Sequence, residues 1–144
     1  MAEDLYQLGE DLITTSARIV RWVQTDGLTL SLASARILAR LFDRGPSRIS
    51  DLANLERSSQ PTITNHVKRL EAAGLVERSV DPSDARAWMI RLTDAGNAEL
   101  ETMRKALGAN VRPHLADLSA RDLKALRQGI EVMRRVMSAD RLRG

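Results

Sequence analysis

One continuous stretch, from Ile49 to Thr93, limits the folds open to this chain more than any other part of its sequence. It begins with a short amphipathic segment, a four-residue turn at 57–60, and a second helical segment that opens Ser-Ser-Gln-Pro-Thr at 58–62. Two strand-like runs follow, separated by the turn-forming hexapeptide Asp-Pro-Ser-Asp-Ala-Arg at 81–86. This order predicts a helix-turn-helix followed by a β-hairpin, a combination that can grip duplex DNA.

The spacing of apolar residues predicts helices along most of the remaining chain, because these residues recur every three or four positions. The expected helices cover about 5–23, 32–42, 51–56, 60–73, 94–110 and 120 onwards; the expected strands cover 75–80 and 87–92, with an isolated bridge at 47–49. Helix starts are expected at Ser31, Ser50, Ser59 or Gln60, Thr93, and Ser119 or Ala120, and stops at Gly27 and Gly74. The expected fold is therefore mainly α with a small β-hairpin wing (α+β).

The chain contains no flexible linker and no internal repeat, so residues 1–144 are expected to form a single domain. Within that domain the winged helix-turn-helix is expected at 28–96. The helix-turn-helix motif itself should cover about 49–73 and the wing 75–92.

The last helical segment carries an apolar seam with 3-4-3-4 spacing, which is typical of packed helices. Its members are Leu123, Leu126, Ile130, Met133 and Met137. The seam can serve either as core within the chain or as a dimer interface. We favour the dimer interface, because the chain has few places to bury both this seam and the first helix, which is apolar on two neighbouring faces.

Composition restricts the function mainly by exclusion. The absence of cysteine rules out disulfides and thiol catalysis, and the two histidines lie far apart, which disfavours a histidine zinc site although Asp and Glu can also bind metal. No nucleophile–base pair or phosphate-binding glycine loop is present, so we expect no enzyme, cofactor or metal. No apolar run is long enough to span a membrane, and the acidic start at 1–4 is unlike a secretory signal; a cytoplasmic protein without a membrane partner is expected.

The helical segment that opens at residues 58–62 has one apolar face and one polar face. Ile63, Val67 and Leu70 recur at i, i+4 and i+7 and should face the core. The outward side chains are then Gln60, Thr62, Thr64, Asn65, Lys68 and Arg69, which are residue types that contact bases and phosphates. A solvated helix face has the same composition. The short helix and tight turn before it favour DNA reading, because they fix the second helix roughly crosswise. The net charge of +3 is compatible with a nucleic-acid partner without requiring one.

The hexapeptide at 81–86 ends in an arginine, and a cation at a hairpin tip can enter the minor groove, where negative potential is concentrated. Arg86 is therefore the candidate probe. Asp84 is expected to accept hydrogen bonds from Arg86 and so hold its guanidinium in one orientation. The alternative is an ordinary surface ion pair, worth less than about 1 kcal/mol.

A series of short motifs keeps continuous spacing through the winged region. They are Leu28-Thr29, Arg36-Ile37-Leu38, Asp51-Leu52-Ala53, Gln60-Pro61-Thr62-Ile63-Thr64, Arg69-Leu70-Glu71, Gly74-Leu75-Val76-Glu77-Arg78, Asp81-Pro82-Ser83-Asp84-Ala85-Arg86 and Leu92-Thr93-Asp94-Ala95-Gly96. Together they resemble the MarR family of bacterial transcriptional regulators. The flanking helices fit this family by pattern rather than by motif.

The resemblance implies a homodimer whose first and last helices, at 1–24 and 97–144, interleave, and a near-palindromic double-stranded operator. It implies a regulator, most often a repressor, that responds to a small aromatic or phenolic ligand held between the dimer helices and the DNA-binding lobe. The implied DNA-binding residues are Ser58, Ser59, Gln60, Pro61, Thr62, Thr64, Asn65, Lys68 and Arg69 on and before the recognition helix, with Asp84 and Arg86 on the wing. The alternative function is a winged-helix module that binds protein without binding DNA.

Two positions remain open at this stage. His66 occupies a slot where the family usually has an aliphatic residue, so it can be a core histidine with a backbone partner, a phosphate contact or a pH sensor. Trp22 is a candidate lining residue of the ligand pocket, whose walls should come from the first, second and fifth helices; its alternative is simple core. The absence of cysteine argues against the peroxide-sensing branch of the family.

Overall fold

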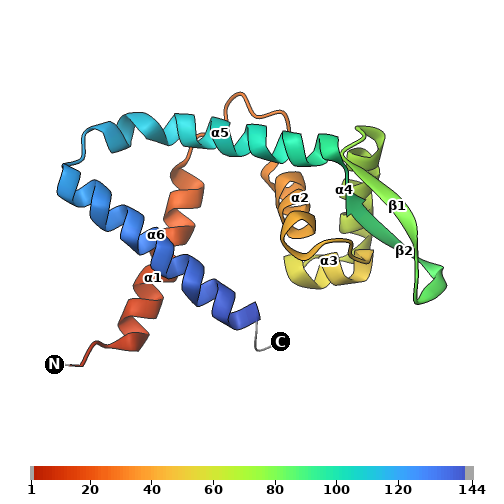
Figure 1. Ribbon diagram of the computed structural model, residues 1–144, viewed down its shortest axis with the longest axis horizontal. Helices are drawn as coiled ribbons and strands as arrows, with labels where there is room; N and C mark the ends of the chain where they lie inside the picture. The colour runs from red at the N-terminus through yellow and green to blue at the C-terminus, as the bar shows by residue number, and fades with distance from the viewer. Residues whose placement is uncertain (1, 142–144) are drawn as a thin grey trace. The chain divides into compact units, whose positions relative to one another are not determined.

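The computed structural model describes residues 2–141, and within them it places six α-helices and one antiparallel hairpin (Figure 1). The elements are α1 (Leu5–Trp22), α2 (Leu32–Arg44), α3 (Ile49–Glu56), α4 (Gln60–Ala72), β1 (Val76–Asp81), β2 (Asp84–Leu92), α5 (Asp94–Ala116) and α6 (Ala120–Arg141). This confirms the mainly α fold with a hairpin wing. Residues 1 and 142–144, at the ends of the expected dimerisation ranges 1–24 and 97–144, lie outside the described residues.

The chain divides into two compact units, 1–107 and 108–144, and the division falls inside α5. The first unit contains the winged helix-turn-helix. The second contains the end of α5 and all of α6. The single domain over 1–144 therefore stays a prediction.

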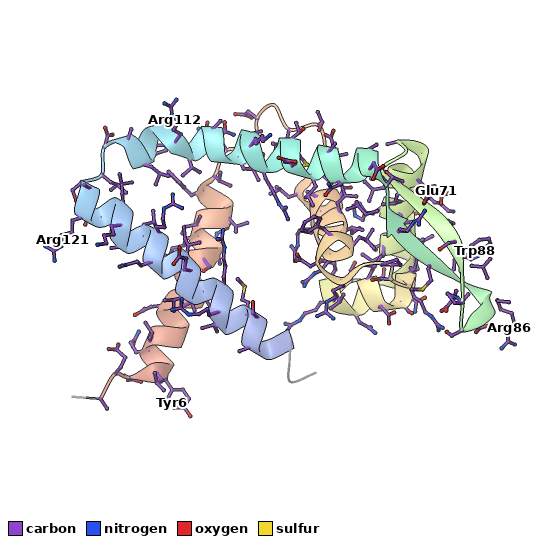
Figure 2. The ribbon with its side chains drawn as sticks, viewed as in Figure 1. Tyr6, Glu71, Arg86, Trp88, Arg112 and Arg121 are labelled. Carbon is purple, nitrogen blue, oxygen red and sulfur yellow. The ribbon has the colours of Figure 1, made fainter. Side chains whose placement is uncertain are left out.

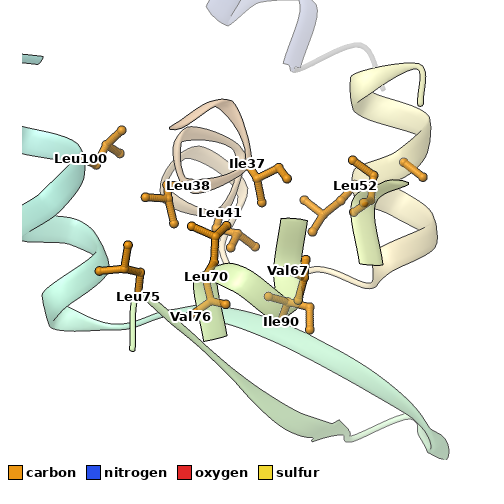
Figure 3. Close-up of a cluster of buried hydrophobic side chains, with 12 residues drawn as sticks. Ile37, Leu38, Leu41, Leu52, Val67, Leu70, Leu75, Val76, Ile90 and Leu100 are labelled. Atoms are coloured by element: carbon orange, nitrogen blue, oxygen red, sulfur yellow. The ribbon is translucent and has the colours of Figure 1, made fainter. Parts of the chain in front are cut away.

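An aliphatic core holds the first unit together, and Figure 3 shows its side chains converging from α2, α3, α4, α5 and the hairpin. Leu38, Leu52 and Ile90 are fully buried at 0 % exposure, each on a different element. Because one side of α4 is committed to this core, the opposite side is free to face a partner. Ser47 joins the core to the wing by the expected isolated bridge to Ile90.

Side-chain caps start three helices as expected. The hydroxyl oxygens of Ser31 and Ser59 accept backbone N–H bonds from Ser34 at 3.1 Å and Thr62 at 3.2 Å, and Ser119 does the same for α6 at 3.0 Å. Gly74 follows the end of α4 at Ala72 and has a φ of 73°, a left-handed conformation that glycine adopts without steric cost.

Two expected helix limits are wrong. The cap of α3 is Arg48 and not Ser50, because both backbone bonds between Ser47 and Ile90 keep the chain extended up to Arg48 and the helix begins directly after it. Gly27 is not the stop of α1: the helix ends at Trp22, where the next residue is already extended, and Gly27 lies in a later turn.

The fifth helix continues to Ala116, beyond the expected end at Asn110, and it includes Pro113, a residue that has no backbone N–H to donate within a helix. After the helix ends, the Leu118 N–H donates to the Leu115 carbonyl at 3.2 Å in a turn. Thr93 begins the helix as expected. Its hydroxyl accepts from the Gly96 N–H at 3.0 Å and donates to the Gly74 carbonyl at 2.7 Å, which fixes α5 to the start of the hairpin.

The hairpin turn is much shorter than the hexapeptide expected at 81–86. Asp81 pairs with Asp84, so only Pro82 and Ser83 separate the strands, and a bulge follows Val80. The strands accordingly cover 76–81 and 84–92 instead of 75–80 and 87–92. The physical reason is the Asp81 carboxylate, which accepts the Ser83 N–H at 2.8 Å and closes a tight turn locally.

The second unit exposes the apolar seam predicted for the last helix. Leu123, Leu126, Ile130 and Met133 are 40–41 % exposed, and Met137 is 58 % exposed. Among the described residues, no helix combines the length and apolarity needed to cross a membrane.

Candidate nucleic-acid interface

Helix α4 presents its two faces as the sequence predicts. Ile63, Val67 and Leu70 are 2 %, 0 % and 1 % exposed and face the core. On the other side Gln60, Pro61, Thr62, Asn65, Lys68 and Arg69 are exposed and Thr64 is half-buried. The exposed face therefore offers amide, hydroxyl and cationic groups along one helix, a set that can contact base edges and phosphates in a major groove.

The turn before α4 positions that face. Arg57 adopts a left-handed backbone conformation with φ of 49°, and the Ser58 N–H donates to the Ala53 carbonyl at 2.9 Å. Ser58 is half-buried and Ser59 is exposed. The Ser59 hydroxyl lies 2.8 Å from the Thr62 hydroxyl, so both polar groups meet at the helix N-terminus.

His66 links α4 to α2 through a side chain. Its Nδ1 lies 3.3 Å from the hydroxyl oxygen of Ser34, which is only 7 % exposed. The imidazole is half-buried. Of the three roles left open for His66, this contact fits best with a half-buried packing role, although the partner is a serine hydroxyl instead of a backbone group.

Arg86 lies at the tip of the wing and points away from the helices, as Figure 2 shows. Its side chain is 93 % exposed. Asp84 holds it less firmly than expected: one carboxylate oxygen accepts the Arg86 backbone N–H at 3.0 Å, and the same oxygen lies 3.4 Å from Nε. The expected contact between Asp84 and the Arg86 guanidinium is present but long, and the same Asp84 oxygen also accepts the backbone N–H.

A stronger ion pair at the wing escaped the sequence analysis. Arg48 donates through Nε to Oδ2 of Asp81 at 2.6 Å, and its Nη2 lies 2.5 Å from the same oxygen in an ion pair. The Ser83 N–H and hydroxyl donate to Oδ1 at 2.8 and 2.7 Å. The Asp-Pro-Ser turn was visible in the sequence, but no local signal pairs it with an arginine 33 positions earlier.

These contacts lower the pKa of Asp81 below its ordinary value of 3.8. The main cause is the pair of hydrogen bonds from Ser83, which stabilise the carboxylate, and the Arg48 guanidinium adds to them; burial acts in the opposite direction. Asp81 is therefore charged at neutral pH.

Trp88 is a second feature of the wing that the sequence analysis missed. It pairs across the hairpin with Val80, and both side chains are 51 % exposed. The outer half of the hairpin thus carries apolar surface that no core covers.

A cavity of about 630 Å³ lies in the first unit. Helices α1, α2 and α5 supply its walls, which include Ala17, Val20, Arg21, Ala35, Arg36 and Leu100. Trp22 is not among the lining residues and is 52 % exposed, so its assignment to a ligand stays a prediction. Arg36 also pairs at 3.0 Å with the Glu56 carboxylate, whose side chain is 8 % exposed.

The described residues contain no group of three or more histidine, cysteine or acidic side chains suited to a metal ion.

A winged helix-turn-helix with a polar recognition face and a cationic wing tip defines the class of DNA-binding transcriptional regulators. Comparison with known proteins identifies the family within that class.

The model of the MarR family matches residues 30–88. The uncharacterized HTH-type transcriptional regulator YdgJ of Bacillus subtilis is 30 % identical over 136 residues, 94 % of this chain and 77 % of that protein. This protein therefore belongs to the MarR family of transcriptional regulators and is not an enzyme.

One further relative and one solved structure are also similar to this chain. The transcriptional repressor NicR of Pseudomonas putida is 41 % identical over 66 residues, 46 % of this chain and 42 % of that protein. The crystal structure of apo MarR from E. coli shares the fold with a TM-score of 0.66 at 19 % identity, over 92 % of this chain and 98 % of that one.

Proposed function

We propose that this protein is a homodimeric repressor that binds a near-palindromic operator and is released by a small aromatic or phenolic ligand. The observation that carries the proposal is the exposed polar face of α4 next to a wing whose tip is an almost fully exposed arginine. The helix suits the major groove, and Arg86 suits the adjacent minor groove.

Apolar surface on α1 and α6 supports the homodimer. No residue of α1 is buried, and Leu5, Ile13 and Val20 are 74 %, 68 % and 60 % exposed. The α6 seam is also exposed. Large exposed apolar surfaces mark interaction sites, and a second copy of the same chain has the same two helices to cover them.

Two observations support a repressor released by ligand. NicR, which is 41 % identical over 46 % of this chain, is named a repressor. The cavity between α1, α2 and α5 has mainly aliphatic walls and a volume that suits a small molecule. Ligand binding there would change the distance between the two recognition helices, which must match consecutive major grooves about 34–36 Å apart.

The direct test is fluorescence anisotropy with labelled duplexes from the DNA around its own gene, repeated over a range of salt concentrations. We expect nanomolar-class affinity for one duplex, steep loss of affinity with salt, and two protomers per site. Affinity that is absent or independent of salt would contradict the proposal and favour the protein-binding alternative.

The release by ligand is tested next. Candidate aromatic ligands are added to the protein–DNA complex, and full DNA affinity in the presence of every ligand at saturation would contradict induced release.

A further inference from the structure

We propose that Arg48 is a positioning residue for the wing: through Asp81 it fixes the hairpin tip to the start of α3, so that Arg86 meets the minor groove in a set place. This inference rests on the proposed DNA binding. It assigns a role to two residues that lie outside the expected DNA-binding set.

The contact between Arg48 and Asp81 is a built site. Asp81 is 6 % exposed. Its Oδ2 accepts a hydrogen bond from Arg48 Nε and lies 2.5 Å from Arg48 Nη2 in an ion pair, and its Oδ1 accepts two hydrogen bonds from Ser83. The Nη2 of Arg48 also lies 3.4 Å from the Ser83 hydroxyl. Among the described residues, no buried side-chain oxygen or nitrogen is left without a hydrogen bond. We call this contact of Arg48 with Asp81 and Ser83 the clamp; the buried polar atoms of Asp81 all have partners within it.

The two ends of the clamp belong to different parts of the fold. Arg48 follows Ser47, whose backbone pairs with Ile90, and its own carbonyl accepts from the Leu52 N–H at 3.1 Å, so its backbone is part of the helix-turn-helix framework. Asp81 pairs with Asp84, which lies two residues before Arg86. A continuous series of fixed contacts therefore runs from the first turn of α3 to the tip of the wing.

The outer half of the hairpin needs such a clamp, because apolar packing does not hold it. Val76 and Ile90 are 2 % and 0 % exposed at the base, whereas Val80 and Trp88 are 51 % exposed further out. A two-stranded hairpin without a packed face is marginally stable in water. Arg48 links the tip to the start of α3 through Asp81 and Ser83, whereas nearer the base Arg78 pairs with Glu71 of α4 at 2.8 Å.

Arg48 could instead touch DNA directly, since its side chain is 40 % exposed. The two roles make opposite predictions for Asp81→Asn. If Arg48 contacts phosphate, the substitution releases the guanidinium and removes a negative charge near DNA, and affinity should be unchanged or higher. If Arg48 positions the wing, affinity should fall although the protein has become more basic.

The first experiment is a double-mutant cycle on operator affinity with Arg48→Ala and Arg86→Ala in the full-length protein. We expect each single substitution to weaken binding several-fold, and Arg48→Ala to add less than about twofold when Arg86 is already alanine. Fully additive effects would overturn the proposal, because Arg48 would then act independently of Arg86.

The matched control for Asp81→Asn is Glu77→Gln, which removes the same charge from the same strand. Glu77 pairs with Arg91 inside the hairpin and does not connect it to α3. We expect several-fold weaker operator binding for Asp81→Asn and unchanged or slightly tighter binding for Glu77→Gln. Equal behaviour of the two variants would overturn the proposal.

A readout without DNA separates this inference from the proposed function. The chain has two tryptophans, so Trp22→Phe leaves Trp88 as the single reporter on the outer wing. Its time-resolved anisotropy should show faster local motion in Arg48→Ala and Asp81→Asn than in Glu77→Gln, while circular dichroism shows the same helix content. Unchanged Trp88 motion overturns the positioning role, whereas failure of the wild-type protein to bind any duplex overturns the proposed function itself.

Discussion

Arg86 is the side chain whose exposure and position most directly predict a role in binding. Its side chain is 93 % exposed and lies at the tip of the wing. We expect Arg86→Ala to weaken operator binding by about fivefold to a hundredfold and to reduce the slope of log affinity against log salt by about one, because one cation leaves the DNA. The control is Arg112→Ala, which removes an exposed arginine of α5; it should keep the wild-type slope of log affinity against log salt.

The Asp81 carboxylate should make stability depend on acid pH. Because its pKa in the folded chain lies below 3.8, its contribution is complete above that value and is lost as pH falls through the folded pKa. We expect the difference in unfolding free energy between wild type and Asp81→Asn to shrink as pH falls from about 5 to about 2. Urea unfolding followed by circular dichroism measures it, and a difference that stays constant over this range would contradict the assignment.

At the scale of elements, the junction between the hairpin and α5 depends on a glycine. A Cβ on Gly96 would lie 2.0 Å from the Leu75 carbonyl oxygen and 2.7 Å from a Leu92 methyl group. Backbone cannot give way as a flexible side chain can, so we expect Gly96→Ala to destabilise the protein by about 2 to 3 kcal/mol.

Gly108→Ala is the matched control for that substitution, because the same helix has nothing within 4 Å of the corresponding Cβ. We expect it to be neutral or to stabilise the protein by about 0.5–1 kcal/mol, since alanine favours helix. Thermal unfolding of both variants checks the pair. Equal effects at Gly96 and Gly108 would show that the close approach to Leu75 does not matter.

At the scale of the whole molecule, the exposed seam of α6 predicts the oligomeric state. We expect Leu126→Glu to convert a dimer to a monomer, because it places a charge among residues that a partner must cover. Gln128→Glu adds the same charge to an exposed position of the same helix and should leave the dimer intact. Sedimentation velocity measures both, and a dimer that survives Leu126→Glu would remove the seam from the interface.

Local patterns in the sequence were sufficient for much of the fold. Apolar spacing identified the helices, and short polar side chains identified starts at Ser31, Ser59 and Ser119 because a cap acts on its own first turn. The inward set Ile63, Val67 and Leu70 followed from helical periodicity alone. Family membership followed from motif spacing, which is also a property of the sequence.

The tertiary structure decided what depends on pairing between distant residues. The start of α3 moved because Ser47 bridges Ile90, and the wing turn shortened because Asp81 closes it. The same long-range geometry turned Arg48 from an ordinary surface arginine into the partner of Asp81. Periodicity and capping act within one or two helical turns, so the sequence alone determined elements and faces, whereas contacts across tens of residues were settled only when the chain folded.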